Sequence, residues 1–199
     1  MSDIRLCEKD FQKLYEILQA SVTNFDCGAI CSKQNDGVPI CCEVNVVIPV
    51  LYTHEFKYVS AHCDLWREFV PEDKSDQRMI DDCGYDDVMV LCKGHKGCNR
   101  DYRSFVCRTF PFYPFISEEG IFMGMTYNYD FEGKCVLVNN HEAINKEYIK
   151  QFIEAWNYLF DIDEMEFEAH YDLCRDIQKK RKRERKPLHI INLEGVKEI

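Results

Sequence analysis

The chain lacks long apolar segments. Its longest apolar run, Val46 to Tyr52, is seven residues long and contains Pro49, whereas a helix that crosses a membrane needs about 20 apolar residues. The first ten residues carry charged side chains where a secretory signal would have its apolar stretch. We therefore expect no membrane span and no export, and a cytoplasmic location.

Linkers and repeats are also missing. No Gly/Ser-rich or Pro-rich segment divides the chain, and no internal repeat of useful length is visible. A chain of 199 residues with 46% hydrophobic residues is long enough to bury a core. We expect one metal-binding domain over residues 1–178, with a cysteine-rich part at about 24–138, and a basic C-terminal tail at 179–199.

Basic residues are in the minority. Lysine and arginine number 25 against 35 acidic residues, which gives a formal net charge of −10. This balance excludes a surface that is basic as a whole, as nucleic-acid or anionic-membrane binding would require. Seven basic residues gather in Lys179–Lys186, so nucleic acid or an acidic protein is open as a partner through that segment alone. The alternative is a solvated helix end, where the helix dipole favours basic residues. We favour this alternative, because the segment has no interleaved aromatic side chains on which bases could stack.

Cysteine, in contrast, is abundant, with 12 residues. In a reducing cytosol, clustered cysteines bind metal more often than they form disulfides. The chain contains no Cys-x2-Cys spacing, so the spacing does not choose between zinc and iron. Eight cysteines fall in turn-rich segments, where loops can bring them together. These candidate metal ligands are Cys27, Cys31, Cys41, Cys42, Cys92, Cys98, Cys107 and Cys135.

Eight thiolates are enough for two centres, because zinc and iron both accept thiolates in sets of four. Adjacent side chains in an extended segment point to opposite sides. At Cys41-Cys42, either the backbone kinks or the pair serves two centres. The remaining cysteines have other expected roles: Cys7, Cys63 and Cys174 pack as small apolar residues, and Cys83 is either an extra ligand or an exposed thiol.

Histidine offers further ligands, since imidazole is common in zinc sites. Four histidines are candidates for a mixed cysteine and histidine site: His54, His62, His95 and His141. Local sequence supports only His95, which lies between Cys92 and Cys98, and even there we favour an exposed side chain. Arg108, next to Cys107, is expected either to donate hydrogen bonds to a metal-bound sulfur or to form a surface ion pair.

The stretch Cys107–Phe112, Cys-Arg-Thr-Phe-Pro-Phe, follows Cys27-x3-Cys31 and the pair Cys41-Cys42. This arrangement resembles the CxxCxxCC family of zinc- or iron-chelating proteins, the YkgJ type, whose members are often labelled iron–sulfur proteins. The resemblance covers about residues 24–138, and Cys135 falls where the family places a late cysteine. It implies zinc, iron or an iron–sulfur cluster as the cofactor.

Three functions follow as hypotheses. The first is a metal-binding protein whose clustered thiolates hold zinc, iron or an iron–sulfur cluster. The second is an iron-dependent redox or group-transfer enzyme that works beside the aromatic run Phe110–Phe115, since some similar proteins are flagellin lysine N-methylases; no Gly-rich nucleotide loop is present. The third is a partner-binding module with a structural metal and a basic tail. Whether the chain is an enzyme stays open.

Hydrophobic periodicity predicts an α+β fold with short strands and with helices at both ends. The clustered cysteines add the expectation of a small, irregular core that bound metal holds together. The run Phe110–Phe115 is expected to pack as core, and its two prolines exclude a helix interior. Residues 72–87 are expected to form an exposed connection, in which a helical turn is an option. Helices are predicted at about 8–20, 53–70, 144–160 and from 164 into the basic run. Strands are predicted at about 44–52, 88–92 and 121–127.

Overall fold

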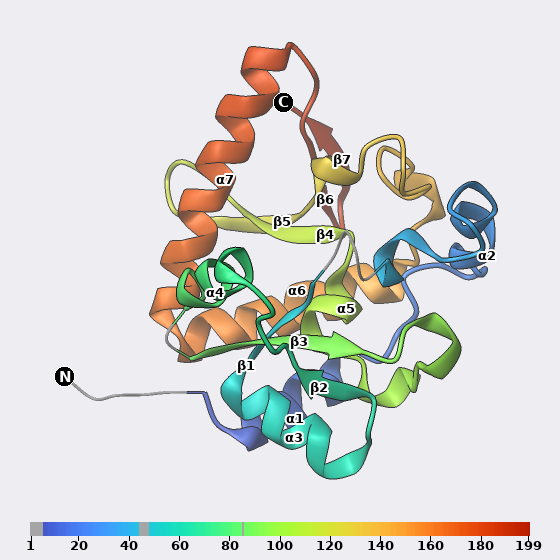
Figure 1. Cartoon of the computed structure of the whole chain (residues 1–199). Coiled ribbons are helices and arrows are strands. Elements are labelled where there is room, and N and C mark those ends of the chain that lie inside the picture. Colours follow the sequence, from blue (N-terminus) through green and yellow to red (C-terminus); the bar gives the residue numbers. More distant parts are fainter. Residues whose placement is uncertain (1–5, 44–47, 85) are drawn as a thin grey trace.

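The computed structural model describes residues 6–43, 48–84 and 86–199. Within these ranges the fold is mixed α+β, as predicted, with seven α-helices and two antiparallel sheets of strand order β1-β3-β2 and β4-β5-β6-β7 (Figure 1). The helices are α1 (Glu8–Ile17), α2 (Gly28–Cys31), α3 (Thr53–His62), α4 (Lys74–Asp81), α5 (Phe105–Thr109), α6 (Lys146–Ile162) and α7 (Glu164–Glu184). The strands are β1 (Val50–Tyr52), β2 (Trp66–Glu68), β3 (Asp87–Cys92), β4 (Phe112–Ile116), β5 (Phe122–Tyr127), β6 (His189–Asn192) and β7 (Gly195–Glu198).

Helix α6 joins the two sheets. It crosses the molecule between them, while α7 stands beside the four-stranded sheet (Figure 1). The side chain of Asn145 accepts a hydrogen bond from the Glu147 N–H and so caps the helix start. The apolar residues Tyr148, Phe152 and Trp156 recur at helical spacing and are buried in the main core cluster, which also holds residues of β1, β3, β4 and β5. One core therefore supports both sheets.

The aromatic run is buried, as expected, but it is divided among three clusters. Phe112 lies in the main core, Phe115 in a second cluster with Cys174, and Phe110 packs beside Cys31 in a third. Pro114 is tolerated inside β4 because β4 is an edge strand of its sheet.

The predicted helix at 53–70 is wrong in its second half. Helix α3 ends at His62, Cys63 is extended, and Trp66–Glu68 form β2 against β3. The Trp66 indole N–H also donates to the Tyr102 carbonyl (2.9 Å). These partners are distant in sequence, so local periodicity does not reveal them.

Two other segments differ in detail from the prediction. The strand expected at 44–52 is described only in part: Val50–Tyr52 form β1, and residues 44–47 lie outside the described residues. The connection at 72–87 contains α4, whose start is capped by the Asp73 carboxylate, which accepts from Ser75 N–H and Asp76 N–H.

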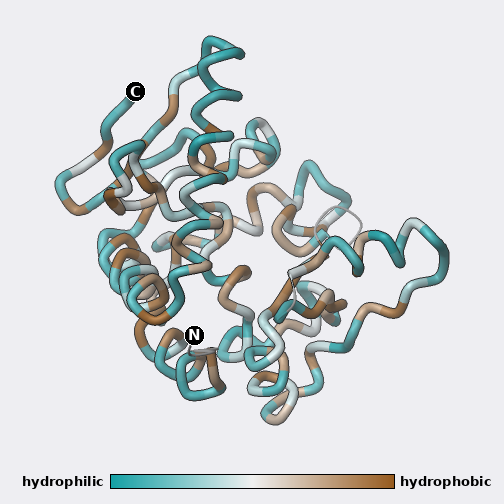
Figure 2. The backbone as a smooth tube through the Cα atoms, turned by 90° about the vertical axis from the view of Figure 1, so that its left-hand side faces the viewer, coloured by the Kyte–Doolittle hydropathy of each residue, from teal (hydrophilic) through white to brown (hydrophobic). Residues whose placement is uncertain are grey.

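The segment assigned to a basic tail is part of the ordered fold. Residues 179–184 complete α7, and residues 189–198 form the β6–β7 hairpin. The last turns of α7 are hydrophilic (Figure 2), yet Arg181 is only 3% exposed. Its guanidinium donates to Pro187 O and Glu132 and lies 3.9 Å from the Tyr129 ring centroid. Among the described residues, four of the seven cations form ion pairs: Lys179–Asp176, Lys180–Asp130, Arg181–Glu132 and Lys186–Glu132.

The cysteines expected to pack behave in different ways. Cys174 is fully buried; its sulfur accepts from Ile116 N–H and its thiol donates to Pro114 O, both at 3.3 Å. Cys63 packs against the main core. Cys7 is exposed, so its predicted burial is wrong; it lies at the N-cap of α1 instead. In the part of the chain described, no helix has the length and apolar character that a membrane span requires.

Gly124 sets the spacing between β5 and β6. Its φ of 132° lies in the region that favours glycine, and a Cβ there would overlap the carbonyl oxygen of Ile191. We expect Gly124→Ala to lower the free energy of unfolding by about 3 kcal/mol in a urea titration. Gly120→Ala is the control, because Gly120 also has positive φ but a Cβ there would meet open space. Equal losses in both variants would contradict the predicted clash.

Candidate metal centre

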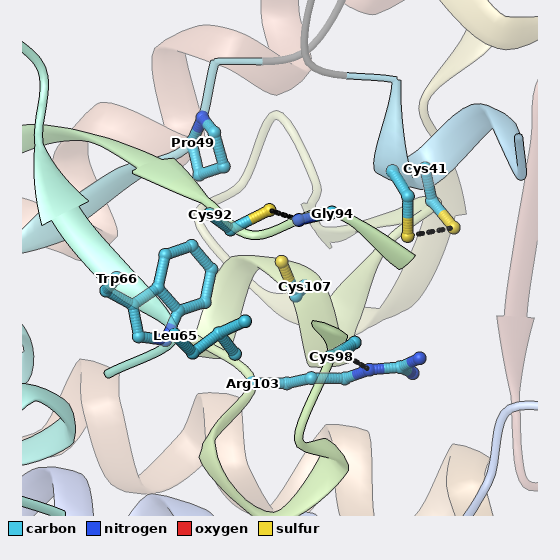
Figure 3. Close-up of a pocket in the computed structure, with 10 residues that line it drawn as sticks. Cys41, Pro49, Leu65, Trp66, Cys92, Gly94, Cys98, Arg103 and Cys107 are labelled. Carbon is cyan, nitrogen blue, oxygen red and sulfur yellow. Dashed lines mark hydrogen bonds between the residues drawn. The ribbon is translucent and has the colours of Figure 1, made fainter. Parts of the chain in front are cut away.

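Five of the eight predicted ligands line one cavity, of about 40 Å³. Figure 3 shows the sulfurs of Cys92 and Cys107 directed into the same space, with Cys41 on the other side. A cavity needs about 10–15 Å³ to hold one water molecule, so this one has room for a metal ion. The five cysteines, which we call the central group, are Cys41, Cys42, Cys92, Cys98 and Cys107.

Three separate segments bring the central group together. Cys41 and Cys42 lie in a 3₁₀ turn, Ile40–Cys42. Cys92 ends β3 and Cys98 follows the next 3₁₀ turn, while Cys107 lies in α5. Pro49, Leu65 and Trp66 complete the wall of the cavity (Figure 3). These apolar side chains limit access of water to the sulfurs, which strengthens electrostatic interactions there.

The buried carboxylate of Glu55 fixes the position of helix α5. Glu55 is fully buried, and its Oε1 accepts from the Tyr15 hydroxyl (2.7 Å) and from the Phe105 N–H at the start of α5 (2.5 Å). Burial raises the pKa of Glu55 to about 7. The Ser104 hydroxyl accepts from the Cys107 N–H (3.2 Å) and caps the same helix. Both contacts fix the position of Cys107.

Two N–H donors are directed at sulfur atoms of the central group. Gly94 has a φ of 76°, which turns the loop back so that its N–H donates to Cys92 Sγ (3.3 Å). Arg103 Nε donates to Cys98 Sγ (3.3 Å). Hydrogen bonds of this kind stabilise thiolates and are typical of the surroundings of metal-bound sulfur.

Within the described residues, the Arg108 guanidinium donates neither to a cysteine sulfur nor to a surface carboxylate. Its guanidinium donates to three backbone carbonyls, those of Leu18 (2.9 Å), Asp101 (2.7 Å) and Arg103 (3.0 Å). It thus connects α1 to the loop before α5. The arginine that donates to a cysteine sulfur is Arg103, five residues earlier.

The thiols of the adjacent pair Cys41-Cys42 perturb each other. Their sulfurs are 3.9 Å apart. The hydrogen bond from Cys41 lowers the pKa of Cys42, and the same interaction raises the pKa of Cys41. Burial raises the pKa of Cys107 to about 12. Cys42 therefore supplies a thiolate more readily than Cys41 or Cys107, where metal binding must displace a proton.

A second group contains the other three predicted ligands, Cys27, Cys31 and Cys135. Cys27 and Cys31 are one helical turn apart, before and at the end of α2, and Cys31 and Cys135 pack in the same cluster. Burial raises the pKa of Cys135, and the charges of Cys27 and Cys31 raise it further. Cys41 is within electrostatic range of both groups, because Cys107 and Cys27 each raise its pKa. We call these three thiols the lateral group.

The thiols surround a space rather than a single point. In residues 6–43, 48–84 and 86–199, no three Cys, His, Asp or Glu side chains are placed closely enough to hold an ion as they stand. Closure on a metal thus requires side-chain rotation, for which the cavity leaves room.

None of the histidine candidates lines the cavity. His62 Nδ1 instead contacts the carbonyl of Tyr58 (2.7 Å), and its ring stacks on Tyr102. His95 is half-buried in the turn before Cys98. Cys83 does not line the cavity either; its thiol donates to the Met79 carbonyl in α4 (3.4 Å).

Sequence reasoning missed the residues that support the sulfurs. The glycine beside the cysteine-rich turn was a usable signal for the Gly94 contact, because a turn that reverses toward a sulfur needs positive φ. Nothing in the sequence marked Arg103 or Glu55. Their contacts depend on how α3, α5 and the loop at 98–104 pack.

No family model matches this chain, and comparison with curated proteins and with solved structures likewise finds no similar protein.

Proposed function

We propose that this chain is a metal-binding protein with two thiolate centres, which hold zinc or iron, the iron either as ions or in a cluster. Cys42, Cys92, Cys98 and Cys107 form the first centre. Cys41 joins the lateral group, Cys27, Cys31 and Cys135, to form the second. The observation that carries the proposal is the shared cavity, lined by five thiols with N–H donors directed at two of them.

The donor set fits such a metal. Four thiolates are a common ligand set for both zinc and iron–sulfur clusters. Four thiolates on one divalent ion leave a charge of −2, and the Arg103 guanidinium lies beside the central group, where it offsets part of that charge. The resemblance of the segment 24–138 to zinc- and iron-chelating proteins supports the same function.

Division of the cysteines into two sets of four follows from the position of the adjacent pair. Cys42 lines the cavity, and its pKa also responds to the charges of Arg103 and Arg100. Cys41 lines the cavity too and feels the charge of Cys107, but the charge of Cys27, in the lateral group, also raises its pKa. A centre closed by four thiolates has no open coordination position, which favours a structural role for the metal over catalysis.

Elemental analysis together with an absorption spectrum of the anaerobically purified chain tests the proposal. We expect about two metal centres per chain. A colourless protein with stoichiometric zinc identifies zinc; a brown protein with iron and sulfide identifies clusters. Protein purified with neither metal, and unable to bind added Zn²⁺ or Fe²⁺ under reducing conditions, would contradict the proposal. Cys83→Ser is the matched control, because Cys83 lies just after α4 and its thiol donates to the Met79 carbonyl.

A further inference from the structure

A buried polar cluster lies between the loop that carries Cys135 and the C-terminal hairpin. It consists of Tyr127 at the end of β5, His141 in the 3₁₀ turn His141–Ala143, and His189 at the start of β6. The His189 ring centroid lies 6.4 Å from that of His141 and 6.1 Å from that of Tyr127. Three segments distant in sequence thus present polar rings to one another.

Each of these side chains has a buried polar atom that finds no hydrogen-bond partner among the residues that the structure describes. The three atoms are Tyr127 hydroxyl oxygen, His141 Nδ1 and His189 Nδ1. Tyr127 itself is fully buried. Buried polar groups are almost always hydrogen-bonded, because desolvation without a partner is costly. Three such atoms in adjacent rings therefore indicate a bound species that they share.

The protonation of His189 suits a metal ligand. Its Nε2 faces Glu198 Oε2 across the β6–β7 pair (3.6 Å). A carboxylate near one ring nitrogen favours the proton on that nitrogen, here Nε2, and so leaves the lone pair on Nδ1.

We propose that His141 Nδ1 and His189 Nδ1 bind a divalent transition-metal ion such as Zn²⁺, with the Tyr127 hydroxyl beside it. This nitrogen site is separate from the cysteine centres. Metal–nitrogen bonds of about 2.0–2.1 Å in tetrahedral geometry bring two imidazole centroids to about 5 Å, so the rings must approach by about 1 Å. His141 lies in a short turn, where such a shift is easily accommodated.

Loading with Co²⁺ under reducing conditions tests this site. Cobalt bound by thiolates gives intense charge-transfer absorption, whereas a site of histidine and phenol oxygen does not give that thiolate absorption. We expect the His141→Ala/His189→Ala double variant to bind one Co²⁺ fewer per chain than the wild type, at unchanged thiolate absorption. His54→Ala, which replaces a histidine on α3, should retain the full amount.

Two results of the cobalt experiment would overturn the nitrogen site. An unchanged cobalt content in the folded double variant overturns the proposal and leaves a bound water as the shared species. An equal fractional loss of cobalt and thiolate absorption also overturns it, because the lost ion was then at the cysteines. If near-UV circular dichroism shows that the double variant does not fold, His141→Gln alone decides the question by the same two measurements.

Discussion

Cys107→Ser is expected to remove the metal from the central group and to leave the lateral group loaded. Cys107 projects into the cavity from α5 (Figure 3), and serine is a much weaker ligand than a thiolate for zinc or iron. Because metal binding contributes directly to folding free energy, we expect a loss of stability on the order of 5 kcal/mol in the metal-loaded protein. Elemental analysis and urea unfolding of the two chains measure both effects.

Two controls separate metal loss from altered packing. In the metal-free protein, Cys107→Ser should cost far less stability, because serine and cysteine have similar size and the Ser104 cap is retained. Cys83→Ser, at the end of α4, should leave metal content and stability unchanged. A Cys107→Ser chain that keeps its full metal content would exclude Cys107 from the central centre. Loss of all metal would show that the two groups bind as one unit.

The second large effect is expected at Glu55, in the pH dependence of stability. The pKa of Glu55 is about 7 in the folded chain, because the carboxylate is buried, against an ordinary value of 4.5. Between these pH values the folded chain keeps a proton that the unfolded chain releases. The free energy of unfolding therefore falls as pH rises from about 4.5 to 7, by about 3 kcal/mol in total.

Glu55→Gln should abolish this decline. The glutamine carbonyl can still accept from the Tyr15 hydroxyl and Phe105 N–H but does not ionise. We expect the variant to gain about 3 kcal/mol relative to the wild type between pH 5 and pH 8, measured by urea unfolding at equal metal loading. Glu154→Gln, on the exposed face of α6, should leave the pH profile of the wild type unchanged. Parallel profiles for Glu55→Gln and the wild type would contradict the prediction.

Local sequence patterns predicted the helices in which buried apolar residues recur at regular spacing. Phe11 and Leu14 marked α1, and Tyr148, Phe152 and Trp156 marked α6, because a helix that packs on a core repeats its apolar residues every three or four positions. The grouping of the cysteines in turns was also informative. All five thiols of the central group were among the candidate ligands.

Long-range contacts could not be predicted in this way. Trp66 lies in the apolar stripe of an apparent helix, yet its strand forms through pairing with β3. Arg103 reads as an ordinary surface cation until the fold brings its Nε to Cys98. Seven cations in Lys179–Lys186 suggested a tail, whereas Arg181 is buried by an ion pair with Glu132, 49 residues away. In each case the partner, not the residue itself, decides the role.

The division of the aromatic run among three clusters has a consequence for how the chain opens. Phe112 and Phe115 on β4, and Phe110 just before it, each belong to a different cluster. Local opening proceeds in cooperative units that share few contacts with their neighbours. If β4 separated from β5, the packing of all three clusters would be disturbed together. A local opening that includes β4 therefore cannot be confined to one cluster. The β4 amides that donate to β5 thus belong to the slowest-exchanging class, which exchanges only through global unfolding.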